Sequence, residues 1–327
     1  MKKVKYIRYG KNPAKSYLIK ANELIKDPIM NNDMSNIKSF EDHLAVPGGK
    51  VWYQRLFTQA SQDKTPMIIL HGGPGVPHNY LNNLSQLATN NPVVLYDQLG
   101  CGKSTIKNEK KELWVLPRFV EELELLVNHL GFPTVYLFGH SWGGTLAIEY
   151  TLKNPNKVKK LILASPLIST PLWVKDTRYL LEQLPSEVLI KVIKHEKEGT
   201  IDSKEYQEAT HIFYQNYLCR LKEWPDDFKY SFSHLNLSVY QTMFGPSEFT
   251  ITGNLINFDR VNELHLLKMP TLITCGRFDE ARPETMQEMV KLLPNAKLVI
   301  FEKSAHIAHL EEPENYLKVL SEFIAEN

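Results

Sequence analysis

The stretch from Val135 to Gly144 constrains the fold of this chain more than any other. Its first four residues, Val-Tyr-Leu-Phe, are apolar and indicate a buried strand, and the residues from Thr145 onward indicate the first turns of a helix. Between these two elements lies a G-x-S-x-G motif with Ser141 at its centre. A sharp turn from strand to helix presents such a serine hydroxyl above the edge of a sheet. The sequence therefore predicts a strand, a tight turn and a helix around Ser141.

The two glycines of the motif meet a steric demand of that turn. The positions two before and two after the serine are crowded and have no room for a Cβ atom, and Gly139 and Gly143 occupy them. The backbone N–H of Trp142, at the helix start, then points to where an oxyanion would form beside Ser141. A glycine-rich corner with a purely structural serine is the alternative interpretation. The apolar strand before the motif and the helix after it favour a nucleophile.

Composition limits the kind of protein that carries this motif. The chain has 327 residues, 43% of them hydrophobic and 23% charged, which is typical of a soluble globular protein with a sizeable core. A net charge of +1 argues against a nucleic-acid partner. Three widely spaced cysteines without a zinc-site spacing indicate a reducing compartment, so we expect a cytoplasmic protein. We expect neither a transmembrane span nor a secretory signal.

Apolar strands alternate with helices along most of the chain, which predicts a mostly parallel sheet with helices on both faces. A hairpin is expected first, at residues 43–57, with its turn at Pro47-Gly48-Gly49. One helix is expected at residues 116–130, ending before Gly131. The remaining strands are expected at residues 67–70, 92–96, 135–138, 158–164, 271–275 and 297–301.

The alternation stops between residues 167 and 255, where the sequence shows helical stretches rich in aromatic residues, at 173–184, 186–197 and 203–221. We expect this segment to form a helical cap over the carboxyl ends of the strands, where ligands of such sheets bind. Leu18, Ile19, Leu24 and Ile25 are compatible with a short amphipathic helix near the N-terminus. The expected division is an accessory segment (1–40), a first core part (41–166), the cap (167–255) and a second core part (256–327).

Two further polar residues follow strands that lie late in the chain. Asp279 comes just after the strand at 271–275, and His306 follows the strand at 297–301. Strand-end placement brings both to the edge where Ser141 lies, and the order Ser, Asp, His is the one in which a sheet of this kind carries a catalytic triad. The imidazole would take the serine proton, and the carboxylate would fix the imidazole tautomer. Taken singly, Asp279 could instead cap a helix, and His306 could instead be a solvated loop residue.

The chain resembles the proline iminopeptidase (prolyl aminopeptidase) branch of the α/β hydrolases, and it is similar to the tricorn-interacting aminopeptidases in particular. The resemblance covers about residues 43–327 and is carried by H-G-G-P-G at 71–75, D-Q-x-G-x-G-x-S at 97–104 and G-H-S-W-G-G at 139–144. It implies an α/β-hydrolase fold with a helical cap, aminopeptidase activity and no cofactor. It also implies that the N–H of Gly73 completes the oxyanion hole with that of Trp142.

The second of these motifs ends in Gly-Lys-Ser but does not predict a phosphate-binding loop. That loop needs a glycine five residues before Gly102, where this chain has Asp97. We expect a supporting turn held by Asp97 and two glycines instead. His306 and His309 suggest a metal site by their spacing, but no further ligand completes it, so no metal is expected and His309 is interpreted as a packing residue.

The resemblance further implies two glutamates that bind the substrate's free amino terminus. Glu280 directly follows Asp279, and Glu248 is the matching residue in the segment 245–253, Gly-Pro-Ser-Glu-Phe-Thr-Ile-Thr-Gly. Paired carboxylates distinguish a terminal ammonium from an internal amide, because only the ammonium satisfies them. A loop glutamate is ordinarily solvent-exposed. The motif match for Glu248 and the position of Glu280 beside Asp279 oppose that interpretation.

These features predict a serine-dependent aminopeptidase that releases an N-terminal residue, proline or another small apolar residue, from short peptides or aminoacyl amides. The first alternative is an amino-acid amidase or ester hydrolase with the same triad. The second is a non-catalytic ligand-binding protein of this fold, against which the complete set of Ser141, Asp279 and His306 argues. Epoxide hydrolases and dehalogenases would need an aspartate in place of Ser141. The sequence does not indicate the oligomeric state.

Overall fold

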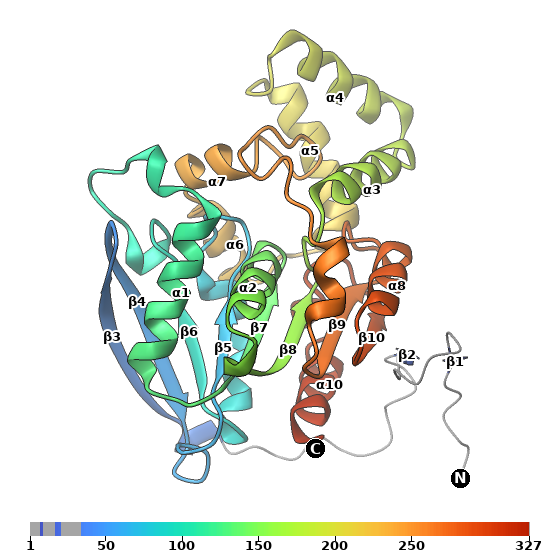
Figure 1. Ribbon diagram of the computed structural model, residues 1–327. Helices are drawn as coiled ribbons and strands as arrows, with labels where there is room; N and C mark the ends of the chain where they lie inside the picture. The colour runs from blue at the N-terminus through green and yellow to red at the C-terminus, as the bar shows by residue number, and fades with distance from the viewer. Residues whose placement is uncertain (1–6, 9–16, 21–33, 327) are drawn as a thin grey trace.

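The computed structural model describes residues 7–8, 17–20 and 34–326. Its strands form one ten-stranded sheet in the order β1-β2-β10-β9-β8-β7-β5-β6-β4-β3 (Figure 1). In this order, every pair of neighbouring strands between β2 and β6 is parallel. At the other side of β6, β4 pairs with β6 and β3 pairs with β4, both in antiparallel orientation. The expected mostly parallel α/β sheet is thus confirmed. The strands after the N-terminal pair are β3 (Lys38–Val46), β4 (Gly49–Phe57), β5 (Met67–Leu70), β6 (Val93–Tyr96), β7 (Val135–His140), β8 (Val158–Ala164), β9 (Thr271–Gly276) and β10 (Ala296–Phe301).

The N-terminal segment differs from the expectation. Leu18 and Ile19 lie in a strand, β2 (Tyr17–Lys20), which pairs in parallel with β10, and β1 (Ile7–Arg8) pairs with β2. The short helix expected at Leu18 and Ile19 is therefore wrong, while Leu24 and Ile25 lie outside the described residues. An edge strand such as β10 presents a row of unpaired backbone groups, and an added strand satisfies them. Periodicity in a short segment does not reveal such a distant partner.

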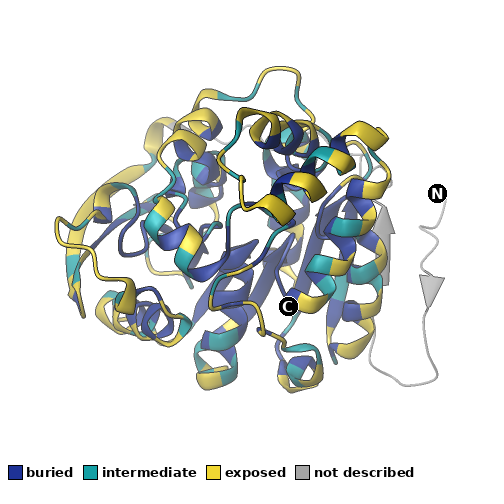
Figure 2. Cartoon of the chain, turned by 90° about the horizontal axis from the view of Figure 1, so that it is seen from above, coloured by how far each residue is buried: buried dark blue, intermediate teal, exposed yellow. Residues whose placement is uncertain are grey.

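Helices cover both faces of the sheet, as the alternating pattern predicts. Within β5, Ile68 and Leu70 pack into the apolar cluster that includes α1 and α2, whereas Met67 and Ile69 pack into the cluster that includes η3 and α10. Figure 2 shows the strands buried between helices whose outer faces are exposed. These helices are the 3-10 helix η3 (His78–Thr89) and the α-helices α1 (Leu116–Leu130), α2 (Trp142–Lys153), α8 (Pro283–Leu292), α9 (Ala308–Glu311) and α10 (Pro313–Ala325).

The segment between β8 and β9 is helical and has a small apolar core of its own around Leu181, Val192 and Phe213. Two of its helices, α6 and α7, are eight and seven residues long and were not expected from the sequence, because so short a pattern has little periodicity. Figure 1 shows α3, α4, α5 and α7 beyond one end of the sheet. The five helices are α3 (Thr170–Glu182), α4 (Ser186–Glu198), α5 (Lys204–Tyr217), α6 (Asp226–Ser233) and α7 (Leu237–Met243).

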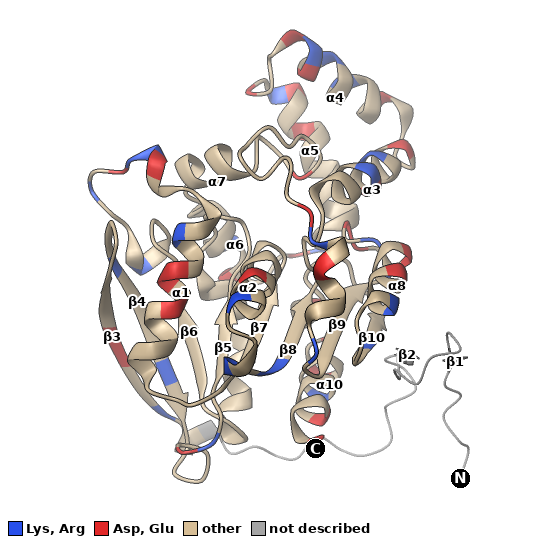
Figure 3. Ribbon diagram, viewed as in Figure 1, with Lys and Arg blue, Asp and Glu red and all other residues tan. Residues whose placement is uncertain are grey.

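The distribution of charged side chains and the hydropathy of the helices agree with the composition of the sequence. Positive and negative side chains are interspersed over the helices and loops that Figure 3 presents, without a large field of one sign in that view. Across residues 7–8, 17–20 and 34–326, no helix combines the length and apolarity needed to cross a membrane.

The turn between β7 and α2 is closed by backbone contacts that only glycine permits. A Cβ atom on Gly139 would lie 2.2 Å from the carbonyl oxygen of Gly143. A Cβ atom on Gly143 would lie 2.1 Å from the carbonyl oxygen of Leu70, in the neighbouring strand β5. The crowding inferred from the motif is thus present. It occurs both within the turn, between Gly139 and Gly143, and between the turn and the adjacent strand β5.

We expect Gly143→Ala to destabilise the protein by about 3 kcal/mol or more, because the clash is with backbone that cannot move independently of β5. Gly131→Ala is the matched control. Gly131 ends α1 with a φ of 72°, and a Cβ atom added there would have no neighbour within 4 Å, so only the conformational strain of about 1–2 kcal/mol applies. Urea unfolding of both variants measures the difference. Equal losses of stability would contradict the steric role of Gly143.

Candidate active site

Ser141 occupies the turn between β7 and α2 with a backbone conformation that is unusual for serine. Its φ is 55° and its ψ is −119°. Such a conformation persists only where the surroundings enforce it. The N–H of Ser141 donates to the carbonyl of Ala164 at the end of β8 (2.9 Å), and its carbonyl accepts from Gly144 (2.8 Å). The side chain faces a cavity between the sheet and the helical segment.

Asp279 and His306 come together at the carboxyl ends of β9 and β10, as the sequence predicts. Nδ1 of His306 lies 2.8 Å from Oδ1 of Asp279, and both residues are almost completely buried. Two backbone groups, the N–H of Ala281 and that of Gly276, also donate to the carboxylate (2.8 and 3.2 Å). An acceptor-only carboxylate places the proton on Nδ1 and leaves Nε2 available as a base. His306 lines the same cavity as Ser141.

Ser165 is a further member of this cluster that the sequence reasoning missed. It follows β8 with a φ of 48°, and its hydroxyl donates to Oδ2 of Asp279 at 2.6 Å. It thus holds the carboxylate oxygen of Asp279 that does not contact the His306 ring. Its position directly after an apolar strand, before Pro166, was the available signal, since the other site residues also follow strands.

The loop after β5 and the start of α2 together offer backbone donors near Ser141. Gly73 and Ser141 line the same cavity. The N–H of Trp142 is the first of α2 and has no acceptor within the helix. The indole of Trp142 donates to Gln98 (2.8 Å), and the amide of Gln98 donates to the carbonyl of His71 (3.0 Å). The D-Q motif thereby fixes the relative positions of the H-G-G-P-G loop and the helix start.

The expected turn around Asp97 is present. Oδ2 of Asp97 accepts from the N–H of Lys103 (2.8 Å), and Oδ1 accepts from the N–H of His78 (2.9 Å). Gly100 and Gly102 both have a positive φ, of 88° and 43°. The carboxylate fills the centre of the turn where a phosphate-binding loop would need open space, in agreement with the exclusion of that motif.

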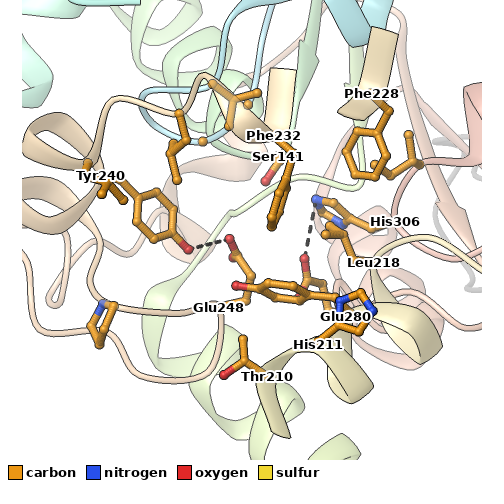
Figure 4. A pocket seen from close by; sticks show the side chains of 18 of the residues that line it. Ser141, Thr210, His211, Leu218, Phe228, Phe232, Tyr240, Glu248, Glu280 and His306 are labelled. Atoms are coloured by element: carbon orange, nitrogen blue, oxygen red, sulfur yellow. Dashed lines mark hydrogen bonds and ion pairs between the residues drawn. The ribbon is translucent and has the colours of Figure 1, made fainter. Parts of the chain in front are cut away.

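The two glutamates, Glu248 and Glu280, line the same cavity as Ser141 and His306 (Figure 4). Glu248 accepts a hydrogen bond of 2.6 Å from the hydroxyl of Tyr240 in α7. Glu280 is 0% exposed, and neither of its carboxyl oxygens has a hydrogen-bond partner among the described residues. Its Oε1 lies 3.7 Å from Nε2 of His306. The unpaired carboxyl oxygens of Glu280 thus lie directly beside His306, the proposed base.

Burial changes the acidity of both glutamates. It raises the pKa of Glu248 to about 6, a rise that Tyr240 and His306 partly oppose. Burial also raises the pKa of Glu280 well above its usual value, and the charges of Glu248 and Asp279 raise it further. A cation that entered this space would remove these penalties, because it would pair with carboxylates that now lack a positive partner.

The cavity has a volume of about 400 Å³ and a mixed lining. Residues of the helical segment supply an apolar wall, namely Tyr214, Leu218, Phe228 and Phe232. Its charged lining is acidic: Asp202 at the exposed rim joins the two glutamates, and no lysine or arginine is among its lining residues in the described part of the chain. Such a lining favours a ligand with a positive charge and an apolar part.

The loop that carries His306 is held by two acidic residues that follow it, Glu311 and Glu312. Glu311 accepts from the N–H of Ala305 (2.6 Å) and from that of Arg220 beyond α5 (2.7 Å), and Glu312 accepts from the hydroxyl of Ser304 (2.7 Å). His309 is buried, and its Nε2 donates to the carbonyl of Tyr80 (3.1 Å). Within the described residues, no cluster of His, Cys, Asp and Glu could hold a metal ion.

The comparisons with known proteins agree with this geometry. Residues 65–313 match the model of the alpha/beta hydrolase fold family. The chain is 44% identical to a proline iminopeptidase of Heyndrickxia coagulans over 285 residues, which are 87% of this chain and 98% of that one. It is 35% identical to a proline iminopeptidase of Thermoplasma volcanium over 298 residues (90% and 100%). A solved proline iminopeptidase of Mycobacterium smegmatis superposes with a TM-score of 0.80 at 32% identity, covering 87% of this chain and 97% of that one. The chain belongs to the proline iminopeptidase family of the α/β hydrolases.

Proposed function

We propose that the protein is a serine aminopeptidase that releases an N-terminal residue, proline or another small apolar residue, from short peptides or aminoacyl amides. One observation carries this proposal: Glu280, a fully buried carboxylate without a hydrogen-bond donor, faces the Ser141 cavity beside Glu248. A buried charge without a partner is costly, so such a group is retained where a ligand supplies the partner. A substrate ammonium meets that need, and an amide does not.

The catalytic steps follow from the positions of Ser141, His306 and Asp279. Nε2 of His306 takes the hydroxyl proton as Ser141 attacks the carbonyl carbon of the N-terminal residue. Asp279 stabilises the imidazolium through Nδ1, and the N–H groups of Gly73 and Trp142 donate to the developing oxyanion. The imidazolium then protonates the leaving amine as the C–N bond breaks. Water hydrolyses the remaining acyl-enzyme by the same steps, with His306 again as the base.

The glutamate pair sets the point of cleavage. With the ammonium held by Glu248 and Glu280, the first carbonyl along the chain is the one that reaches Ser141, so one residue is released. An N-blocked substrate would leave the carboxylates buried without a cation. The helical segment, residues 167–255, acts in this proposal as the cap that encloses the substrate, because it supplies the apolar wall and Glu248.

We expect Ser141→Ala to reduce kcat by ~10⁴-fold to 10⁶-fold while the protein stays folded, because a triad without its nucleophile loses nearly all turnover. Phenylmethylsulfonyl fluoride should label Ser141 in the wild type, as mass spectrometry of peptides would show. Ser233→Ala, which removes an exposed hydroxyl on α6, is the control and should keep full activity. A Ser141→Ala enzyme with a tenth of wild-type turnover would contradict the assignment.

The amine site is tested by comparing substrates with and without an ammonium. We expect Glu248→Gln and Glu280→Gln each to lower kcat/KM for Pro-naphthylamide by roughly tenfold to 150-fold, since a hydrogen bond to a charged group contributes about 1.5–3 kcal/mol. Hydrolysis of p-nitrophenyl acetate, which has no ammonium, should change little. The two effects need not add, because both carboxylates contact the same group.

The control for general electrostatics is Asp202→Asn, which removes a carboxylate from the exposed rim of the same cavity and should have a small effect on both substrates. Equal losses on the amide and the ester in the glutamate variants would mean that these residues support the triad geometry. Efficient cleavage of N-acetyl-Pro-naphthylamide by the wild type would replace the aminopeptidase with a general amidase or esterase.

The burial of the Glu280 carboxyl also predicts a pH-dependent loss of stability. The pKa of Glu280 is raised in the folded state, so its contribution is favourable below the unfolded pKa and is lost as pH rises through the folded pKa. We therefore expect Glu280→Gln to raise the Tm of the protein without substrate more at pH 8 than at pH 5, because burial opposes ionisation of the Glu280 carboxyl in the folded state whereas the unfolded chain ionises it freely. Scanning calorimetry at both pH values measures this. A Tm difference that does not grow with pH would show that Glu280 already has a cationic partner.

A further inference from the structure

A buried pair, Tyr80 and His140, lies beside the triad and takes no part in the mechanism above. Tyr80 belongs to η3, and His140 is the last residue of β7, directly before Ser141. Both are 3% exposed, and both line the Ser141 cavity. The Tyr80 hydroxyl lies 2.9 Å from Nδ1 of His140. It also accepts the N–H of Gly72, the residue before the proposed oxyanion donor Gly73, at 2.7 Å.

The other side of the His140 ring contacts the loop of the catalytic base. Nε2 of His140 lies 3.0 Å from the backbone carbonyl of His306, and the two imidazole rings meet edge to face with centroids 4.7 Å apart. A further bond, from Nε2 of His309 to the carbonyl of Tyr80, connects α9 to the same tyrosine. Hydrogen bonds therefore connect the oxyanion loop, the residue before the nucleophile and the base loop in one continuous path.

The direction of each hydrogen bond in this path is fixed. A carbonyl only accepts, so Nε2 of His140 carries the proton and Nδ1 accepts from the Tyr80 hydroxyl. Burial and the neighbouring His306 and His309 lower the pKa of His140 well below its usual value, which keeps the ring neutral and preserves this arrangement. The single proton of Ser165 is directed to Asp279, so His140 is the main donor to the His306 carbonyl.

The packing leaves little freedom for these groups to shift. A Cβ atom on Gly72 would lie 3.0 Å from the Tyr80 hydroxyl, 3.2 Å from Nδ1 of His140 and 3.2 Å from Cβ of Ser141. The oxyanion loop therefore lies against both members of the pair and against the nucleophile. Loss of the Tyr80 hydroxyl would remove the partner of the Gly72 N–H and of Nδ1 of His140, which would weaken the hold on the loop beside Ser141.

We propose that Tyr80 and His140 are positioning residues that hold the oxyanion donors and the His306 ring at a fixed separation around Ser141. They act through Gly72 and His306 and do not exchange protons with the substrate. The proposal rests on Ser141 and His306 having the roles assigned above, but not on the identity of the substrate. Displacement of reacting groups by about 1 Å can reduce rates by ~100-fold, so the geometry kept by this path affects the chemical step.

The test is Tyr80→Phe, which removes one oxygen and keeps the ring. We expect kcat to fall roughly tenfold to a hundredfold for both Pro-naphthylamide and p-nitrophenyl acetate. The KM for Pro-naphthylamide should stay near the wild-type value, because Glu248 and Glu280 are untouched. Titration with a fluorophosphonate counts the competent sites, so that a partly unfolded sample is not mistaken for a slow enzyme. An equal effect on both substrates also separates this test from the amine-site test above.

The matched control is Tyr316→Phe. Tyr316 is equally buried, and its hydroxyl lies 3.0 Å from the side chain of Thr274, outside the path. We expect both tyrosine variants to lower Tm to a similar extent, whereas only Tyr80→Phe lowers kcat. The proposal is overturned if Tyr80→Phe keeps wild-type kcat, if its loss is confined to KM, or if Tyr316→Phe reduces kcat as much.

A second pair of variants tests the path at His140. Glutamine can still donate to the His306 carbonyl and accept from Tyr80, whereas leucine can do neither. We therefore expect His140→Gln to retain more kcat per titrated site than His140→Leu. Equal kcat values per site for these two variants would show that hydrogen bonding by His140 does not position the base, and would overturn its assigned role.

Discussion

The close contact between the turn at Ser141 and the end of β5 is the constraint on which the rest of this structure depends. Gly143 packs against the carbonyl of Leu70 at a distance that excludes any side chain. The contact holds the start of α2 against the strand that leads into the H-G-G-P-G loop. As a result, Ser141, the N-terminus of α2 and Gly73, the second proposed oxyanion donor, lie together at one corner of the sheet. Asp279 and His306 then reach this corner because parallel strands end at the same edge.

Hydrogen bonds between loops fix the positions of the site residues that the strand ends bring together. Gln98 connects the helix start to the H-G-G-P-G loop, Ser165 holds Asp279, and Glu311 connects the base loop to the segment after α5. These residues lie in loops or helices that follow different strands. Such contacts hold the groups of the proposed active site in place, so that they need not move during the reaction. The Tyr80–His140 path extends the same principle across the cavity.

The two glutamates illustrate how groups suited to binding a cation lower the stability of the protein without its ligand. Within the part of the chain that the structure describes, the Glu280 carboxylate receives no hydrogen bond, and the Glu248 carboxylate receives one from the Tyr240 hydroxyl. Both have a raised pKa, so the substrate-free fold carries the unfavourable free energy of buried acids. In the proposed function, a substrate ammonium removes that unfavourable term on binding, whereas a neutral amide leaves it in place. The proposed selectivity for a free amino terminus therefore depends on carboxylates that the protein itself does not pair with a cation.

The sequence alone determined the central elements, because their signals are local. Apolar runs bounded by turns located β5 and β8, and periodicity with a terminal glycine located α1. The G-x-S-x-G motif singled out Ser141, and placement directly after late strands singled out Asp279 and His306. The tertiary structure decided what depends on distant partners. Residues 17–20 pair with β10, Ser165 donates to Asp279, and Tyr80 contacts His140 across 60 residues of chain. Periodicity reports only on neighbours within a few turns of chain, whereas these contacts form only after the sheet has brought its strand ends together.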